Sequence, residues 1–307
     1  MPFSSCRHNL KGKASVQLMG LWVCQVCKQI STSKFILILA LNDAGHSFED
    51  ASLYKRNMYF YCRFMYRYNM QKISIIIPAY NEAQTIAHVL LRIISTPLQN
   101  LDKEILVIDD CSNDGTSDVL KNFCLHHPTV AIRCFRQSTN QGKGAAIHRG
   151  IAEASGDFIV IQDADLEYDP GEYSELLRPI TDGYADVVYG SRFMGSKPHR
   201  ILFFWHTIGN KFLTFLSNMF TNLNLTDMET CYKLFKAEIL KSIRLKEKRF
   251  GFEPEVTAKV AQYPGVRIYE VGISYYGRTY EEGKKINWKD GFRAIWCILK
   301  YNIWSRK

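Results

Sequence analysis

The stretch DFIVIQDAD, residues 157–165, is an apolar, strand-like run that ends in two carboxylates, Asp163 and Asp165. Glu167 follows two residues later, and on an extended chain side chains at this spacing point to the same side. Carboxylates held this close repel one another unless a cation neutralises them. Their hard oxygens suit Mg²⁺ or Mn²⁺. The sequence therefore predicts a divalent-metal site for a diphosphate, formed by Asp163, Asp165 and Glu167, although an isolated Asp-x-Asp is more often a solvated turn.

Short apolar segments alternate with helix-like segments on both sides of this stretch. The expected strands are residues 73–77, 104–108, 130–135, 158–162 and 186–189, and the expected helices are residues 82–95, 116–126, 144–154 and 171–180. Such strands joined by helical crossovers indicate an α/β fold with a mostly parallel, doubly wound sheet. Ligands of these folds bind at the carboxyl ends of the strands. Because Pro78, Asp110, Asp165 and Arg192 all follow strands, we expect them at one site.

Polar residues mark the turns after the first two strands. Glu82 in PAYNE (78–82) is either a favourable first-turn acid of the next helix or a hydrogen-bond acceptor for a base or sugar. Asp110 is either part of an Asx turn before Asp114 or a contact to base or ribose. NQGKG (140–144) is similar to a phosphate cradle but lacks the Walker spacing. Its glycines could therefore only open the turn, or Lys143 could contact a diphosphate.

Two arginines are candidate anion clamps, because a planar guanidinium matches phosphate with paired hydrogen bonds. Arg192 ends the motif GSR (190–192) after the fifth expected strand. Arg278 lies in the basic, glycine-containing stretch YYGRTYEEGKK, residues 275–285. This stretch is either a loop that closes over a bound diphosphate or a solvated hairpin.

Charge is unevenly distributed along the 307-residue chain, whose net charge is +9. Residues 70–240 contain 15 Lys and Arg against 20 Asp and Glu, whereas residues 241–307 contain 15 against 7. An acidic centre suits a cation site, and a basic C-terminal part suits an anionic ligand or membrane surface. An acidic core without a base-stacking sheet signature does not match a nucleic-acid partner, so we expect none.

Membrane contact is expected at the surface and not through a spanning helix. The apolar run Phe35–Leu41 is too short to cross a bilayer. Residues 201–220 are apolar but interrupted by polar side chains, which predicts an amphipathic helix at an interface. Residues 288–304 carry tryptophans and basic residues at helical spacing, which suits either an interfacial helix or a helix that covers the sheet.

A domain of residues 70–307 is expected, preceded by a segment of different character. Residues 1–69 lack sustained periodicity, and Met70 stands directly before the first convincing strand. The lone Cys-x-x-Cys of Cys24 and Cys27 lacks the second pair that a zinc site needs. We interpret residues 1–69 as a poorly ordered accessory segment or a wrongly extended start of translation.

Four motifs resemble those of family-2 glycosyltransferases: SIIIPAYNE (74–82), DDCSNDGT (109–116), DAD (163–165) and GSR (190–192). Their order and spacing are most similar to the branch of dolichol-phosphate mannose synthases and polyprenyl-phosphate glucosyltransferases. The resemblance covers roughly residues 72–300. It implies that family's GT-A fold, a Rossmann-like sheet with helices on both faces.

The resemblance also implies roles for individual residues. The nucleoside would be held by Pro78, Tyr80, Glu82, Ile108 and Asp110. The donor's diphosphate and its Mg²⁺ or Mn²⁺ would be held by Asp163, Ala164, Asp165 and Glu167. Donor or lipid phosphate would meet Arg192, and the closing loop would contribute Arg278 and Lys284, or Lys285 in its place. Mannose synthases often carry Gln at the position of Glu167 and a basic residue at that of Glu253, so the resemblance does not establish GDP-mannose as donor.

The implied reaction is inverting, metal-dependent transfer of a hexose from a UDP- or GDP-hexose to a polyprenyl or dolichyl phosphate. The implied place is the cytoplasmic face of a membrane, bound peripherally. The catalytic residues would be Asp163, Asp165, Arg192 and Arg278. A phosphate acceptor is already an anion, so placing it in line and stabilising the departing diphosphate suffice without a strong base. A hydroxyl acceptor would need a base, either Glu253 or Glu255. A non-catalytic nucleotide-sugar or membrane-binding protein is a third hypothesis, disfavoured by the intact acidic triplet.

Overall fold

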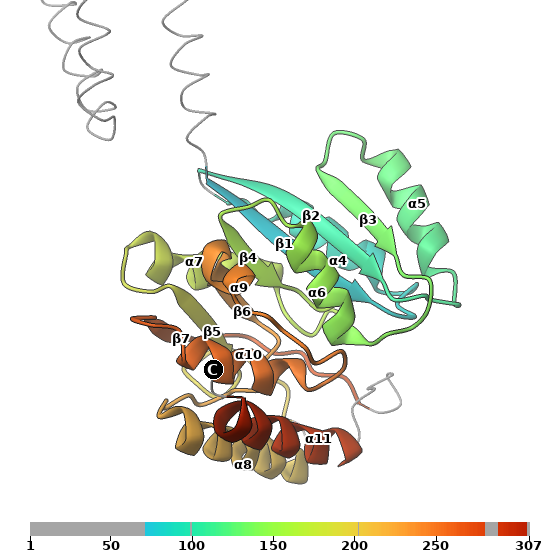
Figure 1. Cartoon of the computed structure of the whole chain (residues 1–307). Helices are drawn as coiled ribbons and strands as arrows, with labels where there is room; N and C mark the ends of the chain where they lie inside the picture. The colour runs from blue at the N-terminus through green and yellow to red at the C-terminus, as the bar shows by residue number, and fades with distance from the viewer. Residues whose placement is uncertain (1–70, 99, 202, 280–287, 306–307) are drawn as a thin grey trace, which may run out of the picture. The chain divides into compact units, whose positions relative to one another are not determined.

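A seven-stranded sheet forms the centre of the part of the chain that the structure describes (Figure 1). The computed structural model of the protein describes residues 71–98, 100–201, 203–279 and 288–305. The strands are β1 (Gln71–Ala79), β2 (Leu101–Asp109), β3 (Ile132–Arg136), β4 (Phe158–Ile161), β5 (Val187–Ser191), β6 (Lys233–Lys236) and β7 (Ile268–Gly272). They are arranged in the order β3-β2-β1-β4-β6-β5-β7. Strand β6 is antiparallel to both neighbours, and the other pairs are parallel.

Helices alternate with the first strands and gather after β5. The described helices are α4 (Ile86–Ser95), α5 (Thr116–His126), α6 (Lys143–Glu153), η3 (Pro170–Glu172), α7 (Tyr173–Thr181), α8 (Phe204–Thr221), α9 (Ala237–Ser242), α10 (Phe252–Ala261), α11 (Trp288–Leu299) and η4 (Lys300–Trp304). Helix α6 packs on β1 and β2. Helices α8, α10 and α11 pack against one another, and α8 and α11 lie at the bottom of Figure 1.

The strand sequences are nearly continuous apolar runs because the sheet is buried on both faces. Strands β4 and β5 are buried along their whole length, as is most of β1 and β2. The register of β1 and β2 pairs Ala79 with Asp109, so both strands end at the same edge of the sheet. Tyr80 and Asp110, which follow them, therefore start neighbouring loops at that edge.

The α/β class and the five strands predicted between residues 73 and 189 are confirmed. The sequence missed β6 and β7, which are only four and five residues long and lack a clear alternation. The helix predicted from Glu82 begins only at Ile86, because Asn81 adopts a left-handed conformation and the chain turns before the helix. The helix predicted over residues 171–180 is divided into η3 and α7.

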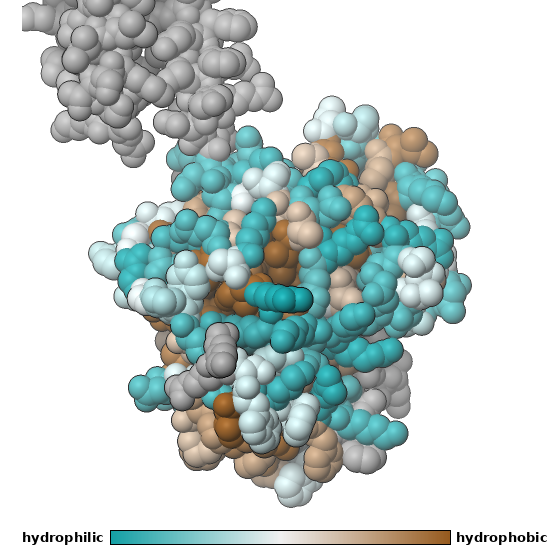
Figure 2. Space-filling model, in the orientation of Figure 1, coloured by the Kyte–Doolittle hydropathy of each residue, from teal (hydrophilic) through white to brown (hydrophobic). Residues whose placement is uncertain are grey.

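Helix α8 confirms the helix predicted within residues 201–220, but it exposes several large apolar side chains. Its small polar side chains Thr214 and Ser217 are buried, whereas Trp205, Phe212 and Phe215 are exposed. An ordinary surface helix buries its large apolar side chains and exposes its polar ones. In Figure 2 apolar side chains gather at the lower end of the molecule, over the layer that contains α8.

Helix α11 packs chiefly against α8 and α10. Of the two alternatives for this segment, the one in which the helix covers the sheet was therefore wrong. Its residues Ala294, Cys297 and Ile298 are buried, while Phe292 and Trp296 are exposed. In the described ranges, no helix combines the length and the apolar character needed to cross a bilayer. The predictions for residues 1–69, Lys284 and Lys285 concern residues outside these ranges.

Candidate active site

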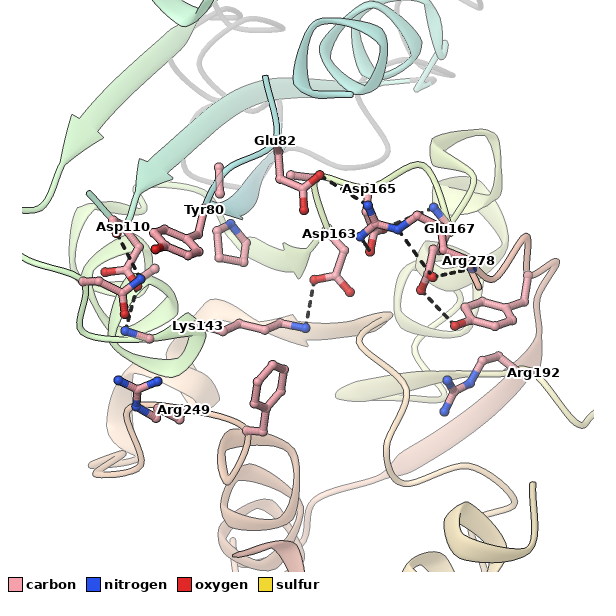
Figure 3. Close-up of a pocket in the computed structure, with 18 residues that line it drawn as sticks. Tyr80, Glu82, Asp110, Lys143, Asp163, Asp165, Glu167, Arg192, Arg249 and Arg278 are labelled. Carbon is pink, nitrogen blue, oxygen red and sulfur yellow. Dashed lines mark hydrogen bonds and ion pairs between the residues drawn. The ribbon is translucent and has the colours of Figure 1, made fainter. Parts of the chain in front are cut away.

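A cavity of about 420 Å³ lies at the carboxyl ends of β1, β2 and β4 (Figure 3). That volume is in the range of small-ligand sites. Eleven residues that the sequence singled out line it: Pro78, Tyr80, Glu82, Asp110, Lys143, Asp163, Ala164, Asp165, Glu167, Arg192 and Arg278. The convergence follows from the topology, because parallel strands bring their carboxyl ends to one edge.

Two of the main residues predicted to hold the donor are not among those that line the cavity. Ile108 is completely buried within β2, with its side chain in the core. A contact of this side chain with a nucleoside is therefore not supported by its position. Lys284 lies outside the described residues.

The sequence suggested that the three acids after β4 lie on an extended chain and point to the same side. The structure does not have this arrangement. The chain turns at Leu166, which has a left-handed conformation with φ of 64°. Asp163 lies 2.8 Å from the Lys143 ammonium, and Asp165 lies 2.8 Å from the Arg278 guanidinium. Their negative charge is thus balanced by side chains of the protein itself.

Glu167 is held in place by two donors from the segment after β7. Its carboxylate accepts hydrogen bonds from the Tyr275 hydroxyl at 2.8 Å and from the Arg278 backbone N–H at 2.7 Å. Among the residues that the structure describes, no three His, Cys, Asp or Glu side chains form a ready metal-binding cluster. The metal site therefore stays a prediction.

The electrostatics of the cavity nevertheless fit a divalent cation. Burial raises the pKa of Asp165 to about 7, with further contributions from Asp163 and Glu167 and an opposing one from Arg278. Because burial and neighbouring carboxylates destabilise the charged form of Asp165, a bound cation would stabilise that form. Its neighbours are also carboxylates, the oxygen donors that Mg²⁺ and Mn²⁺ prefer.

Lys143 lies at the centre of the cavity and stays charged despite its burial. Burial lowers its pKa, but Asp163 and Glu253 outweigh this effect and raise the pKa above its ordinary value. The ammonium is 3.5 Å from the buried Glu253 carboxylate. Lys143 therefore bridges the acids of the β4 turn and the start of α10, within reach of an anionic ligand.

Arg278 connects acids from two loops. Its guanidinium lies 3.5 Å from Glu82 and 3.8 Å from Glu167, in addition to its ion pair with Asp165. Glu82 also accepts a hydrogen bond from the Thr85 hydroxyl. Because α4 begins only at Ile86, the interpretation of Glu82 as a first-turn acid was wrong.

Asp110 fixes the loop that precedes α6. Its carboxylate accepts hydrogen bonds from the Gln137 amide and from the backbone N–H groups of Gln141 and Gly142, at 2.7–2.8 Å. The alternative Asx turn is formed by Asp114, which accepts from the Thr116 N–H. The sequence placed Asp110 at the site, but it could not reveal these partners.

Arg192 also lines the cavity, but part of its guanidinium is already engaged. Two of its N–H groups donate to the buried Asp227 carboxylate at 2.7 Å, and its Cζ atom lies 5.1 Å from the centre of the Tyr275 ring. The sequence missed Asp227, because no spacing rule connects it with Arg192 across 35 residues.

Arg249, Phe250 and Tyr275 line the cavity and were also missed. The first two lie in a loop without a motif, so only the cluster of basic residues at 244–249 could have drawn attention to them. Glu255, one candidate base, is completely buried and accepts from the backbone N–H groups of Lys246 and Glu247. It holds a loop and does not line the cavity, so its position gives no support to the hypothesis that it acts on a substrate.

A family model described as "Glycosyl transferase family 2" matches residues 74–244. The dolichol-phosphate mannosyltransferase of Pyrococcus furiosus is 28% identical over 233 residues, which are 75% of this chain and 64% of that relative. The undecaprenyl-phosphate mannosyltransferase of Micrococcus luteus is 30% identical over 223 residues, which are 69% of this chain and 87% of that relative. The chain thus spans less than two thirds of the Pyrococcus protein.

A solved structure with a similar fold is glucosyl-3-phosphoglycerate synthase of Mycobacterium tuberculosis, in complex with Mn²⁺, UDP and phosphoglyceric acid. The TM-score is 0.60 at 20% identity, and the match covers 78% of this chain and 81% of that one. A likeness at this identity concerns the fold, and it confirms the GT-A architecture expected from the sequence.

Proposed function

The chain belongs to glycosyl transferase family 2, and from this we propose that it transfers a hexose from a nucleotide-diphosphate sugar to a polyprenyl phosphate at a membrane surface. The observation that carries the proposal is the convergence of Glu82, Asp110, Asp163, Asp165 and Arg278 on one cavity at the strand ends. The acceptor class is supported by two relatives named as mannosyltransferases of dolichol phosphate and undecaprenyl phosphate.

The donor site would use the first strand ends for the nucleoside and the β4 turn for the diphosphate. Tyr80 and Asp110 lie on the wall formed by the loops after β1 and β2. Asp163, Asp165 and Glu167 would hold Mg²⁺ or Mn²⁺, which would neutralise the charge of the diphosphate. Lys143 and Arg278 carry positive charge to the same place, and each could exchange a carboxylate partner for a phosphate oxygen.

The acceptor needs no strong base, because a phosphate monoester is already an anion at neutral pH. The protein then has to place the acceptor oxygen in line with the anomeric carbon, opposite the departing diphosphate. This geometry inverts the anomeric configuration. Arg192 suits the acceptor phosphate, because Asp227 uses only two of its five N–H donors and fixes the direction of the others.

The membrane part of the proposal rests on helix α8. Its exposed face carries Trp205, Phe212, Phe215 and Met219, and Trp296 of the neighbouring α11 is also exposed. A helix with large apolar side chains on its outer face suits the interfacial region of a bilayer. Such docking would bring a membrane-held lipid phosphate to the end of the molecule that carries Arg192.

A panel of UDP- and GDP-hexoses, each tested with a polyprenyl phosphate, would decide the reaction. We expect a product whose mass equals polyprenyl phosphate plus one hexose, formed with one nucleotide class and only with a divalent cation. Free sugars and peptides with hydroxyl groups serve as competing acceptors. Transfer to a hydroxyl acceptor alone, or hexose transfer that withstands removal of all divalent cations, would contradict the proposal.

A further inference from the structure

The loop between α9 and α10 presents a basic side chain to the cavity that no predicted motif contains. Arg249 and Phe250 come from this loop and line the cavity, and Figure 3 shows Arg249 at its wall. Arg249 lies on the side of Asp110, whereas Arg192 lies on the opposite side of the cavity. The two arginines therefore face different parts of any ligand that fills it.

Arg249 differs from the other cations of the cavity in its partners. Lys143, Arg192 and Arg278 are each within 2.8 Å of a carboxylate oxygen. The Arg249 side chain makes no hydrogen bond or ion pair with any residue in the described ranges. A guanidinium is strongly suited to phosphate oxygens, and this one can bind them without first giving up a carboxylate.

The position of Arg249 is determined by close backbone packing on the start of α6. A Cβ atom on Gly142 would lie 2.6 Å from both the Arg249 Cγ and the Lys248 carbonyl oxygen. The Ala145 N–H donates to that same carbonyl at 2.9 Å. The stem of Arg249 thus lies directly over Gly142, whose own N–H donates to Asp110.

The other side of the loop is held by two buried carboxylates. Glu255 accepts from the backbone N–H groups of Lys246 and Glu247. Glu247 accepts from Arg293 at 2.5 Å, Lys300 at 3.0 Å and the Tyr301 hydroxyl at 2.7 Å. The backbone that carries Arg249 is therefore fixed on both sides, and only the outer part of its side chain remains adjustable.

We propose that Arg249 is a donor-binding residue that contacts the phosphate of the nucleotide sugar next to the nucleoside, from the wall shared with Asp110 and Gly142. This role rests on the proposed function. It adds to that function a donor contact made by a residue outside the sequence motifs. Arg249 adds a positive charge to a cavity that Glu82, Asp163, Asp165 and Glu167 make acidic.

The test compares Arg249→Ala with Lys248→Ala by calorimetric titration of the full chain with UDP and with GDP in the presence of Mg²⁺. Lys248 is the adjacent exposed residue, so its variant loses the same charge from the same loop. We expect Arg249→Ala to raise the Kd of the nucleotide that the wild type binds about 10- to 100-fold, as for one lost charge-assisted hydrogen bond. Lys248→Ala should change it less than about twofold, because Lys248 does not line the cavity.

Steady-state kinetics separate a donor role from an acceptor role. Arg249→Ala should raise the KM for the nucleotide sugar and leave the KM for the prenyl phosphate unchanged. The KM of Arg249→Lys for the nucleotide sugar should lie between those of the wild type and Arg249→Ala. A rise in the acceptor KM alone, or equal losses in both alanine variants, would overturn the assignment. Unchanged nucleotide binding by Arg249→Ala would also overturn it while leaving the proposed function intact. A wild type that binds neither UDP nor GDP would overturn the proposed function itself.

Discussion

Residues 71–186 and residues 187–305 contribute opposite charges to the same cavity. All five acids come from the first part: Glu82, Asp110, Asp163, Asp165 and Glu167. Three of the four cations come from the second part: Arg192, Arg249 and Arg278. The first part holds Asp110 with backbone N–H groups, whereas the second sends long side chains across from separate loops. The cavity is thus a junction between an acidic half and a basic half, and neither half is electrostatically complete alone.

The two parts also differ on their outer surfaces. In the first, the exposed large apolar side chains are Tyr80, Leu91, Leu125 and Tyr184, which lie far apart in sequence. In the second, the exposed Trp205, Phe212, Phe215 and Met219 all belong to α8. Among the described residues, the first part thus exposes few large apolar side chains, whereas the second exposes many, several of them on one helix, which suits an apolar partner.

The largest effect is expected from removing one charge of the acidic half. Asp165→Asn keeps the size of the side chain but removes the charge that faces Arg278, so we expect kcat to fall about 100- to 1000-fold. The melting temperature should change little. Asp102→Asn, at an exposed position of β2, is the matched control. Unchanged turnover with saturating Mg²⁺ or Mn²⁺ would remove Asp165 from the site.

The basic half can be disrupted without changing a residue that lines the cavity, by removing Asp227, the buried partner of Arg192. Asp227→Ala leaves the Arg192 guanidinium without its buried partner, and such a loss costs about 3–5 kcal/mol in the free energy of unfolding. The control is Asp118→Ala, which breaks an exposed ion pair with Lys121 and should cost less than about 1 kcal/mol. Urea unfolding measures both. Equal effects would show that the Arg192–Asp227 pair is no more important than a surface pair.

The pH dependence of the free energy of unfolding tests whether the Glu247 carboxylate stabilises the loop that carries Arg249. Burial alone would raise the pKa of Glu247, but hydrogen bonds from Arg293, Tyr301 and Lys300 outweigh it and lower the pKa to about 2. A folded-state pKa below the unfolded value of about 4.3 means that the carboxylate stabilises the fold above that pH. This contribution is lost as the pH falls from about 4.3 towards 2.

Glu247→Gln should therefore lower the free energy of unfolding by about 1–3 kcal/mol at pH 7, a range that allows for the partial exposure of Arg293 and Lys300. The difference from the wild type should narrow between pH 4 and pH 3. Urea titrations at pH 7, 4 and 3 provide the comparison. A difference that stays constant over this range would mean that the charge of Glu247 is not the stabilising feature.

The contrast between the two surfaces predicts a smaller effect on vesicle binding. Trp205→Ser removes a side chain that is 78% exposed on α8, and Leu125→Ser removes one that is 76% exposed on α5. We expect the first to reduce co-sedimentation with anionic vesicles about tenfold and the second to leave it unchanged. Added salt should weaken binding by the wild type, since part of the attraction is Coulombic. A wild type that stays in the supernatant at low salt, yet acts on short water-soluble prenyl phosphates, would rule out docking.

The smallest effect is expected from shortening the chain to begin at Met70. Every residue of the cavity lies after this position. The melting temperature should stay within about 2 °C and kcat/KM within about twofold, because both halves are retained. A large loss of either quantity would show that residues 1–69 support the domain.

The sequence predicted the acidic half better than the basic half, for a physical reason. Asp110, Asp163 and Asp165 follow apolar strands, and parallel strands necessarily bring their ends together. Arg249 and the pair of Arg192 with Asp227 depend on how loops without periodicity pack across the cavity. Such contacts join residues far apart in sequence, and no local pattern records them.

Local backbone geometry could also not be predicted from the sequence. The left-handed Leu166 changes the directions of the three acids after β4, although a Leu at positive φ is unusual. Helix α8 was predicted as a helix from its composition. That Thr214 and Ser217 are its buried side became clear only from the packing against neighbouring helices.

Glu247 makes the C-terminal helix and the cavity loop one cooperative unit. Arg293 and Lys300, which donate to its carboxylate, come from α11 and η4, whereas the carboxylate itself belongs to the loop that carries Arg249. If the C-terminal segment opened alone, it would leave a buried carboxylate without donors, and this cost discourages independent opening. Local unfolding of the C-terminal helix is therefore transmitted to the cavity wall, so loss of this helix would loosen the loop that carries Arg249 without touching any residue that lines the cavity.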